Sequence, residues 1–124
     1  MIRLVRASVM AELQAANVDW PVYDYRPDDM TGLPAVVVDR PSVSVNVQHH
    51  IASVPVVVIG RRDGTADAQY ELDEVASRVV DLLAGPQFNV DRIEPATASI
   101  AELTYPAYTV TVSCGVTYCK ENPQ

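Results

Sequence analysis

The feature that most constrains this fold is a run of β-branched residues that leads through a polar loop into an amphipathic segment. The run extends from Val56 to Ile59 and is bounded by Pro55 and Gly60. Four consecutive β-branched residues predict a short strand that is buried on both faces. After the loop, apolar residues recur at three- and four-residue spacing, which predicts a helix with one buried face: Leu72, Val75, Ala76, Val79, Leu82 and Leu83. Strand and helix are therefore expected to share a core.

The ends of this helix also carry recognisable signals. Thr65 or Asp67 is able to accept a backbone N–H at its start, and acidic residues in the first turn suit the helix dipole. Gly85 and Pro86 are expected to stop it. The rest of the chain has to be arranged around this strand-to-helix unit.

The size and charge of the chain limit its class. A length of 124 residues predicts a single domain spanning residues 1–124. The net charge of −7 argues against a general affinity for DNA or for anionic membranes, although DNA is still able to pass through a channel that such a protein lines.

The first ten residues lack the continuous apolar core of a signal peptide, and no apolar run is long enough for a membrane span. A cytosol-like site of synthesis is therefore expected, with Cys114 and Cys119 reduced. Five positions apart, they face opposite sides of a regular strand, so neither a mutual disulfide nor a zinc site is expected.

Hydrophobic periodicity predicts the remaining elements in order. Residues 2–17 form an amphipathic helix, and residues 20–27 and 33–38 form two strands that pair as an antiparallel hairpin. Residues 88–103 form a strand with a bulge or bend at Pro95. The pair Tyr105–Pro106 turns the chain into a last strand over residues 108–114, and residues 120–124 are a frayed tail.

Strands that follow one another without alternating helices indicate an α+β fold. We expect a mainly antiparallel sheet of four to five strands, with two α-helices packed on it and a protruding β-arm or loop.

That arm is the segment of residues 41–53, in which Val43, Val45 and Val47 alternate with polar residues. The alternation is typical of a strand, which either continues the sheet or reaches out as an arm that pairs outside its own domain. We favour the protruding arm.

Candidates for chemistry are few. Arg61 and Arg62 lie between a strand and a helix, where anion-binding loops occur, but the glycine pattern of such loops is missing. His49 and His50 point to opposite sides of an extended chain and suit a surface or interface better than a shared metal ion. No catalytic, cofactor-binding or metal-binding residues are predicted, and the protein is not expected to be an enzyme.

Several phrases together resemble the tail terminator, or tail-completion, proteins of long-tailed siphophages, particularly those of actinobacterial hosts. These phrases are PVYDYRP, LPAVVV, VPVVVIGRRDG before an amphipathic helix, and the final YPAYTVTVSCGV, and the similarity covers residues 2–119.

The resemblance implies a structural virion protein that is assembled in the bacterial cytoplasm, binds no cofactor and contacts no membrane. Proteins of that family form a hexameric ring that caps the tail tube and joins it to the head-completion proteins of the neck. DNA only passes through the ring. The alternatives are another neck protein, such as a stopper or adaptor, or a small anion-binding enzyme or module that uses Arg61 and Arg62.

On this hypothesis, the contacts to ring neighbours, tube or neck come from the arm and from the loop before the second helix. The candidate interface residues are Val43, Val45, Val47, His49, His50, Arg61 and Arg62.

Overall fold

The computed structural model describes residues 2–27, 32–45 and 50–115. Within these ranges the chain forms two helices and a six-stranded, mostly antiparallel sheet. The predicted α+β class is therefore confirmed, with more strands than the four to five expected. The elements in chain order are α1 (Ile2–Ala15), β1 (Val22–Tyr23), β2 (Ala35–Val38), β3 (Ser42–Val45), β4 (His50–Ile59), α2 (Ala66–Leu83), β5 (Asn89–Ile100) and β6 (Leu103–Gly115).

Strand β4 is the centre of the sheet, whose order is β1-β2-β4-β6-β5. One side of β4 pairs with β6 along most of its length. The other side pairs with β3 near its start and with β2 near its end. The β-branched run that dominates the sequence thus becomes the end of a ten-residue strand with neighbours on both sides.

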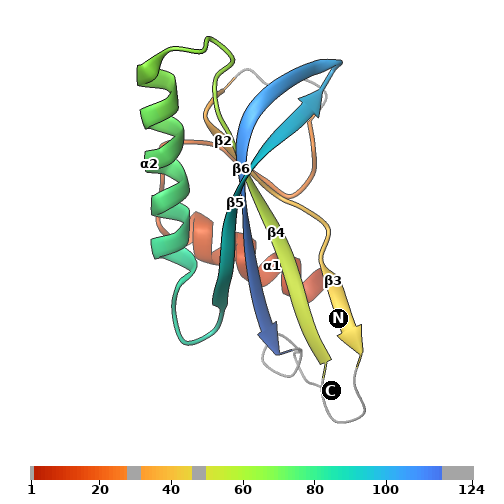
Figure 1. The fold of residues 1–124 in the computed structure, drawn as a ribbon. Helices are drawn as coiled ribbons and strands as arrows, with labels where there is room; N and C mark the ends of the chain where they lie inside the picture. Colours follow the sequence, from red (N-terminus) through yellow and green to blue (C-terminus); the bar gives the residue numbers. More distant parts are fainter. Residues whose placement is uncertain (1, 28–31, 46–49, 116–124) are drawn as a thin grey trace.

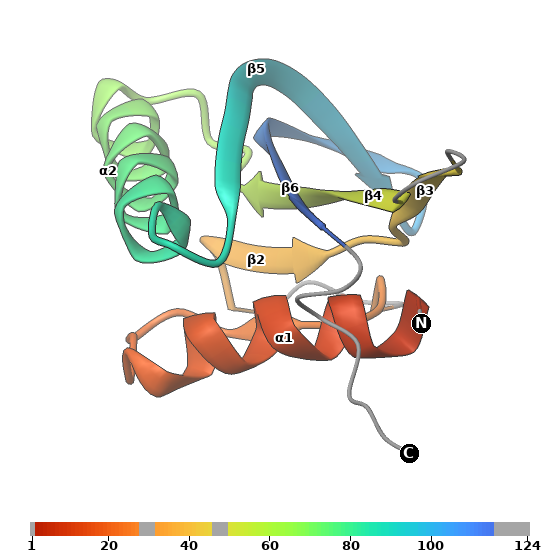
Figure 2. The same ribbon diagram turned by 90° about the horizontal axis from the view of Figure 1, so that it is seen from below.

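Both helices cover the same face of the sheet (Figures 1 and 2). The buried side chains of α1 are Val5, Val9 and Leu13, which repeat every four residues and so lie on one face. The buried face of α2 contains five of the six residues expected from periodicity, and the sixth, Leu82, is partly buried. Alternate residues of β2, β4 and β6 complete this core.

A second, smaller cluster lies on the opposite face of the sheet. Val37, Val57 and Ile59 pack there against residues from the far ends of β5 and β6, including Ile100 and Tyr105. Strand β5 is strongly bent in Figure 2 and has a register shift between Val90 and Arg92. This curvature brings the β5–β6 hairpin over a face that the helices leave uncovered.

Three local predictions are wrong. Strand β1 pairs with β2 in parallel, so residues 20–38 do not form the expected antiparallel hairpin. The irregularity in β5 lies at residues 90–92 rather than at Pro95. The chain reverses at Ala101 and Glu102, both with positive φ, while Tyr105 and Pro106 lie inside β6.

Candidate functional site

The segment predicted as an arm pairs within its own chain. Strand β3 runs antiparallel to the start of β4, with Ser42 opposite Ser53 and Val45 opposite His50. The described part of this segment therefore continues the sheet of its own chain along one edge, and its other edge has no strand partner among the described residues. The strand alternative is correct because valine-serine alternation suits a strand with one side against the core. Val47 and His49 lie outside the described residues.

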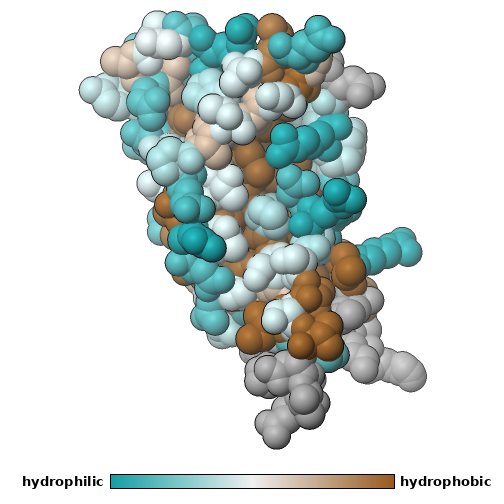
Figure 3. All heavy atoms as spheres, turned by 45° about the vertical axis from the view of Figure 1, so that its right-hand side comes forward, coloured by the Kyte–Doolittle hydropathy of each residue, from teal (hydrophilic) through white to brown (hydrophobic). Residues whose placement is uncertain are grey.

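The valines of β3 have different surroundings. Val43 is half-buried and packs against the main core, whereas Val45 is 76% exposed. Ile51, on the neighbouring strand, is 42% exposed. Figure 3 shows hydrophobic side chains gathered at this end of the molecule. Because Val45 is opposite His50 and Ser44 is opposite Ile51, Val45 and Ile51 lie on opposite faces of the sheet. Each therefore adds exposed apolar area beside this edge on its own face.

Among the described residues, β1, β3 and β5 each pair with one neighbouring strand only, and β1 has just two residues. The edges of β3 and β5 differ in chemistry. Along β5, the charged residues Asp91, Arg92 and Glu94 are followed by Pro95, and the register shift lies at its start. Charges, proline and bulges are the features by which edge strands resist pairing with other chains. The sequence of β3, Ser-Val-Ser-Val, has none of them, so this edge is open to a further strand.

The second predicted contact region lies at the opposite end of β4. Because β4 has ten residues, the Arg61–Arg62 loop is about 30 Å from the β3 end. The structure therefore divides the predicted interface residues into two separate groups.

Arg61 and Arg62 do not act as a pair. Arg61 Nε donates to Glu71 Oε1 at 2.9 Å, and Arg61 Nη1 lies 3.2 Å from Asp63 Oδ2. Arg62 Nε donates to the backbone oxygen of Thr104 at 2.9 Å, and its guanidinium lies 5.7 Å from the ring centroid of Tyr105.

These contacts already use several of the N–H donors that would otherwise bind an anion. The hollow between the arginines and the start of α2 has a volume of about 460 Å³. At the start of α2, the backbone N–H of Ala68 already donates to Thr65 Oγ1 at 3.1 Å. To bind Arg61 and the start of α2, an anion in this hollow would have to displace the carboxylates on Arg61 and the Thr65 hydroxyl that caps the helix. Arg61 and Arg62 are thus structural connections between the loop, α2 and the β5–β6 hairpin.

Two titratable groups are perturbed by contacts that sequence spacing did not reveal. Tyr108 Oη donates to Asp73 Oδ1 at 3.0 Å, and this hydrogen bond raises the pKa of Tyr108, since it favours the neutral phenol. Burial acts to raise the pKa of Asp39, but the hydrogen bonds from the Arg26 guanidinium and the Arg40 N–H outweigh it, so that pKa is lowered.

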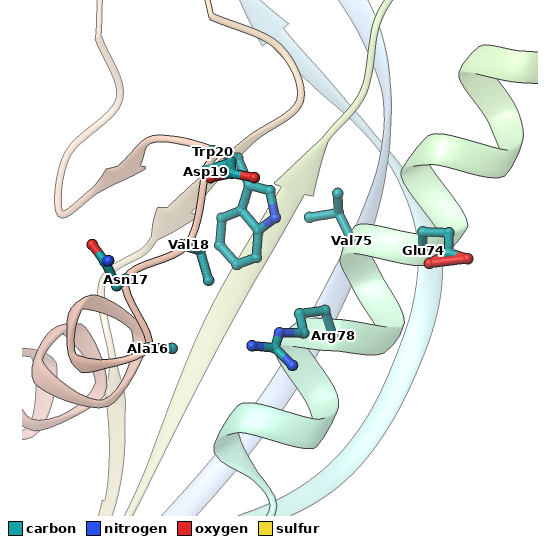
Figure 4. A pocket seen from close by; sticks show the side chains of 8 residues that line it. All are labelled: Ala16, Asn17, Val18, Asp19, Trp20, Glu74, Val75 and Arg78. Carbon is teal, nitrogen blue, oxygen red and sulfur yellow. The ribbon is translucent and has the colours of Figure 1, made fainter.

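A hollow of about 330 Å³ lies where the chain leaves α1 and passes α2 (Figure 4). The side chains of Trp20 and Val75 point toward one another, while Glu74 points away from them. Trp20 belongs to the partly buried residues that pack on the main core. This hollow is a helix-to-loop packing junction.

The described residues contain no group of three or more side chains that suits a metal ion. Within the same ranges, no helix is long and apolar enough to cross a membrane.

The chain matches no protein-family model and no curated protein. The geometry of its own residues is therefore the basis for a functional statement. In that geometry, the unprotected edge of β3, with Val45 exposed beside it, is the best candidate for a contact with another protein chain.

Proposed function

We propose that this protein is a structural subunit of a phage tail, the tail terminator, which forms a ring on the end of the tail tube and joins it to the neck. The proposal is supported by the resemblance of residues 2–119 to tail terminator proteins. A small domain with two helices on one face of a mainly antiparallel sheet is compatible with such a subunit. The partners are further copies of the chain in a hexamer, the tail tube protein and the head-completion protein.

The observation that carries the proposal is the open edge of β3. A closed ring needs two different surfaces on each subunit, because each copy contacts the next one head to tail. An edge strand that lacks charge and proline offers its backbone N–H and C=O groups to a neighbour. The exposed side chain of Val45, which belongs to β3 itself, adds apolar area to that contact on one face of the sheet.

Two alternative functions are another protein of the neck and an anion-binding module. A stopper or adaptor of the neck would also use an open strand edge, and only the position of the protein in the particle separates these roles. An anion-binding module would need free guanidinium groups, whereas Arg61 and Arg62 are held by their own chain. We therefore do not favour that module.

The experiment is to remove the gene from the phage and to image the tails by electron microscopy. Tails are expected to exceed their normal length or to remain separate from heads, and wild-type protein supplied in trans should restore them. Tails of normal length that join heads in its absence would rule out the proposal.

A substitution tests the role of β3 in the same assay. V45K should leave the fold intact, since the side chain is 76% exposed and surface changes alter the free energy of unfolding by about 0.5 kcal/mol or less. It should nevertheless fail to restore joined tails, because a lysine on an edge strand opposes pairing. The matched control is I93K on β5, where Ile93 is 44% exposed and the edge is already protected. Equal complementation by both variants would contradict a role for β3.

A further inference from the structure

The exposed charges of this protein are separated between two sides of the molecule. The outer surface of α2 is acidic, since the helix contains five acidic residues and one arginine, for a net charge of 1 − 5 = −4. Exposed Asp67, Glu74 and Asp81 follow one another at seven-residue intervals, which places them in one stripe along the helix. Tyr70, which is 65% exposed, and the exposed Arg78 lie in the same stripe, whose net charge is therefore 1 − 3 = −2.

A basic surface lies around the start of α1 and the junction of β2 with β3. It contains four of the nine basic residues of the chain, Arg3, Arg6, Arg26 and Arg40, against Asp24 and Asp39, for a local net charge of 4 − 2 = +2. Two adjoining hollows, of about 780 and 540 Å³, shape this surface and share Ile2 and Arg6.

Arg6 is the central residue of this basic surface. Its Nε is buried and has no hydrogen-bond partner among the described residues. Neither Arg6 nor Arg3 forms an ion pair within those residues. The exposed Arg3 and the accessible part of the half-buried Arg6 side chain are therefore the guanidinium groups that a partner's carboxylates are able to bind.

The shape of the basic surface also suits a helix. The larger hollow follows one face of α1, where the small side chains of Ala7 and Ala11 lie between the arginines and Gln14. Small residues allow another helix to approach closely. The stripe from Asp67 to Asp81 is about 21 Å long, which matches the length of α1 with its fourteen residues.

The acidic and basic surfaces lie on different sides of the molecule, although both helices cover the same face of the sheet and contact each other. In Figures 1 and 2, α2 lies at the left, while the amino-terminal end of α1 lies at the right, near β3. A subunit with two different, complementary surfaces contacts its neighbours head to tail, and such contacts close into a ring when the rotation between copies allows it.

We infer that the acidic stripe of α2 in one copy docks onto the arginine surface of α1 and the β2–β3 junction in the next copy. This inference rests on the proposed ring and names the charged contact between its subunits. The partner is a second copy rather than nucleic acid for two reasons: Asp24 and Asp39 lie within the basic surface, and the net charge of −7 repels DNA.

The test uses two charge-reversed variants of the whole chain. The first, R3E/R40E, makes the basic surface acidic, and the second, E74R/D81R, makes the acidic stripe basic; all four side chains are exposed. Self-association is measured by sedimentation velocity at low and at high salt. We expect the wild type to associate more strongly at low salt than at high salt. Each variant alone should have an association constant that is lower than that of the wild type by a factor of roughly ten or more.

Two further samples separate this contact from general charge effects. An equal mixture of the two variants should associate as the wild type does, because every contact in an alternating ring is again between opposite charges. The control variant R92E/E102R changes exposed charges outside both surfaces and should behave like the wild type.

The inference is overturned if the wild type remains monomeric at millimolar concentration in low salt, or if the mixture fails to recover association. It is also overturned if duplex DNA binds the wild type, loses that binding in R3E/R40E, and self-association is unchanged. The tail assay separates this inference from the proposed function. If tails are overlong when the gene is removed but normal when either charge-reversed variant is supplied, the proposed function stands and only the charged contact is ruled out.

Discussion

Gly60 lies where β4 ends and the loop to α2 begins, close to Leu72 of α2. A Cβ added there would lie 3.1 Å from Leu72 Cδ2, 3.2 Å from its Cβ and 3.3 Å from its Cδ1. Leu72 is 2% exposed and packed in the main core, so it has little room to move. We therefore predict that G60A destabilises the protein.

The magnitude follows from two opposing effects. Inserting a methyl group into a packed core costs about 1–3 kcal/mol. Replacing glycine by alanine also restricts the unfolded chain, which offsets about 0.4–1 kcal/mol of this cost. We expect G60A to lower the free energy of unfolding by about 1–2 kcal/mol, and L72A alone to lower it by about 2–5 kcal/mol.

The assay is urea unfolding followed by the fluorescence of Trp20, with free energies taken from the transition midpoints. In the double variant G60A/L72A, the added methyl group enters the space that Leu72 vacates. The loss in the double variant should therefore be smaller than the sum of the two single losses by about 1 kcal/mol or more. The control is G85A, where an added Cβ meets no atom within 4 Å and should be neutral or slightly stabilising. The close approach of Gly60 to Leu72 would be refuted if the losses in the free energy of unfolding of G60A and L72A were strictly additive. A G60A protein as stable as G85A would refute it as well.

Two further predictions concern α2. Removing the amino-terminal cap by T65A should cost about 1 kcal/mol in urea unfolding, because a backbone N–H in the first turn loses its acceptor, whereas T65S should keep most of the stability. The bond from Tyr108 to Asp73 should make Y108F less stable than the wild type by about 1 kcal/mol at neutral pH. Because the folded-state pKa of Tyr108 is raised, this difference should persist up to about pH 10 and disappear as the pH rises through the folded-state pKa; a difference that grows in alkali would contradict the assignment.

Hydrophobic periodicity predicted the helices and strands that bury side chains in the main core. It predicted α1, α2 and the central strand, since one buried face leaves a repeat of two or of three to four residues in the sequence. The amino-terminal cap was also visible, and Thr65 holds that position.

Turns and strand partners were less visible because they depend on the rest of the molecule. The turn at Ala101 and Glu102 uses positive φ angles without glycine or asparagine, so no turn residue marks it. Val22 and Tyr23 pair in parallel with β2, and nothing local in a strand of two residues encodes the direction of its partner.

The candidate contact surface was only partly accessible from sequence. The alternation of Val43 and Val45 indicated a strand, but whether that strand pairs within its own sheet depends on where β4 begins. Arg61 and Arg62 are adjacent in sequence, yet Arg61 binds Glu71 ten residues away as well as nearby Asp63, and Arg62 binds Thr104 forty-two residues away. No spacing rule reveals the two distant partners.

The most direct test of the central claim is to locate this chain in the assembled phage particle by cryo-electron microscopy. The account predicts a hexameric ring between the end of the tail tube and the neck, with β3 of each subunit at a contact with another chain. A ring on the head side of the neck would assign the protein to the stoppers or adaptors instead. A particle in which the chain lies along the tube, or from which it is absent, would contradict the account.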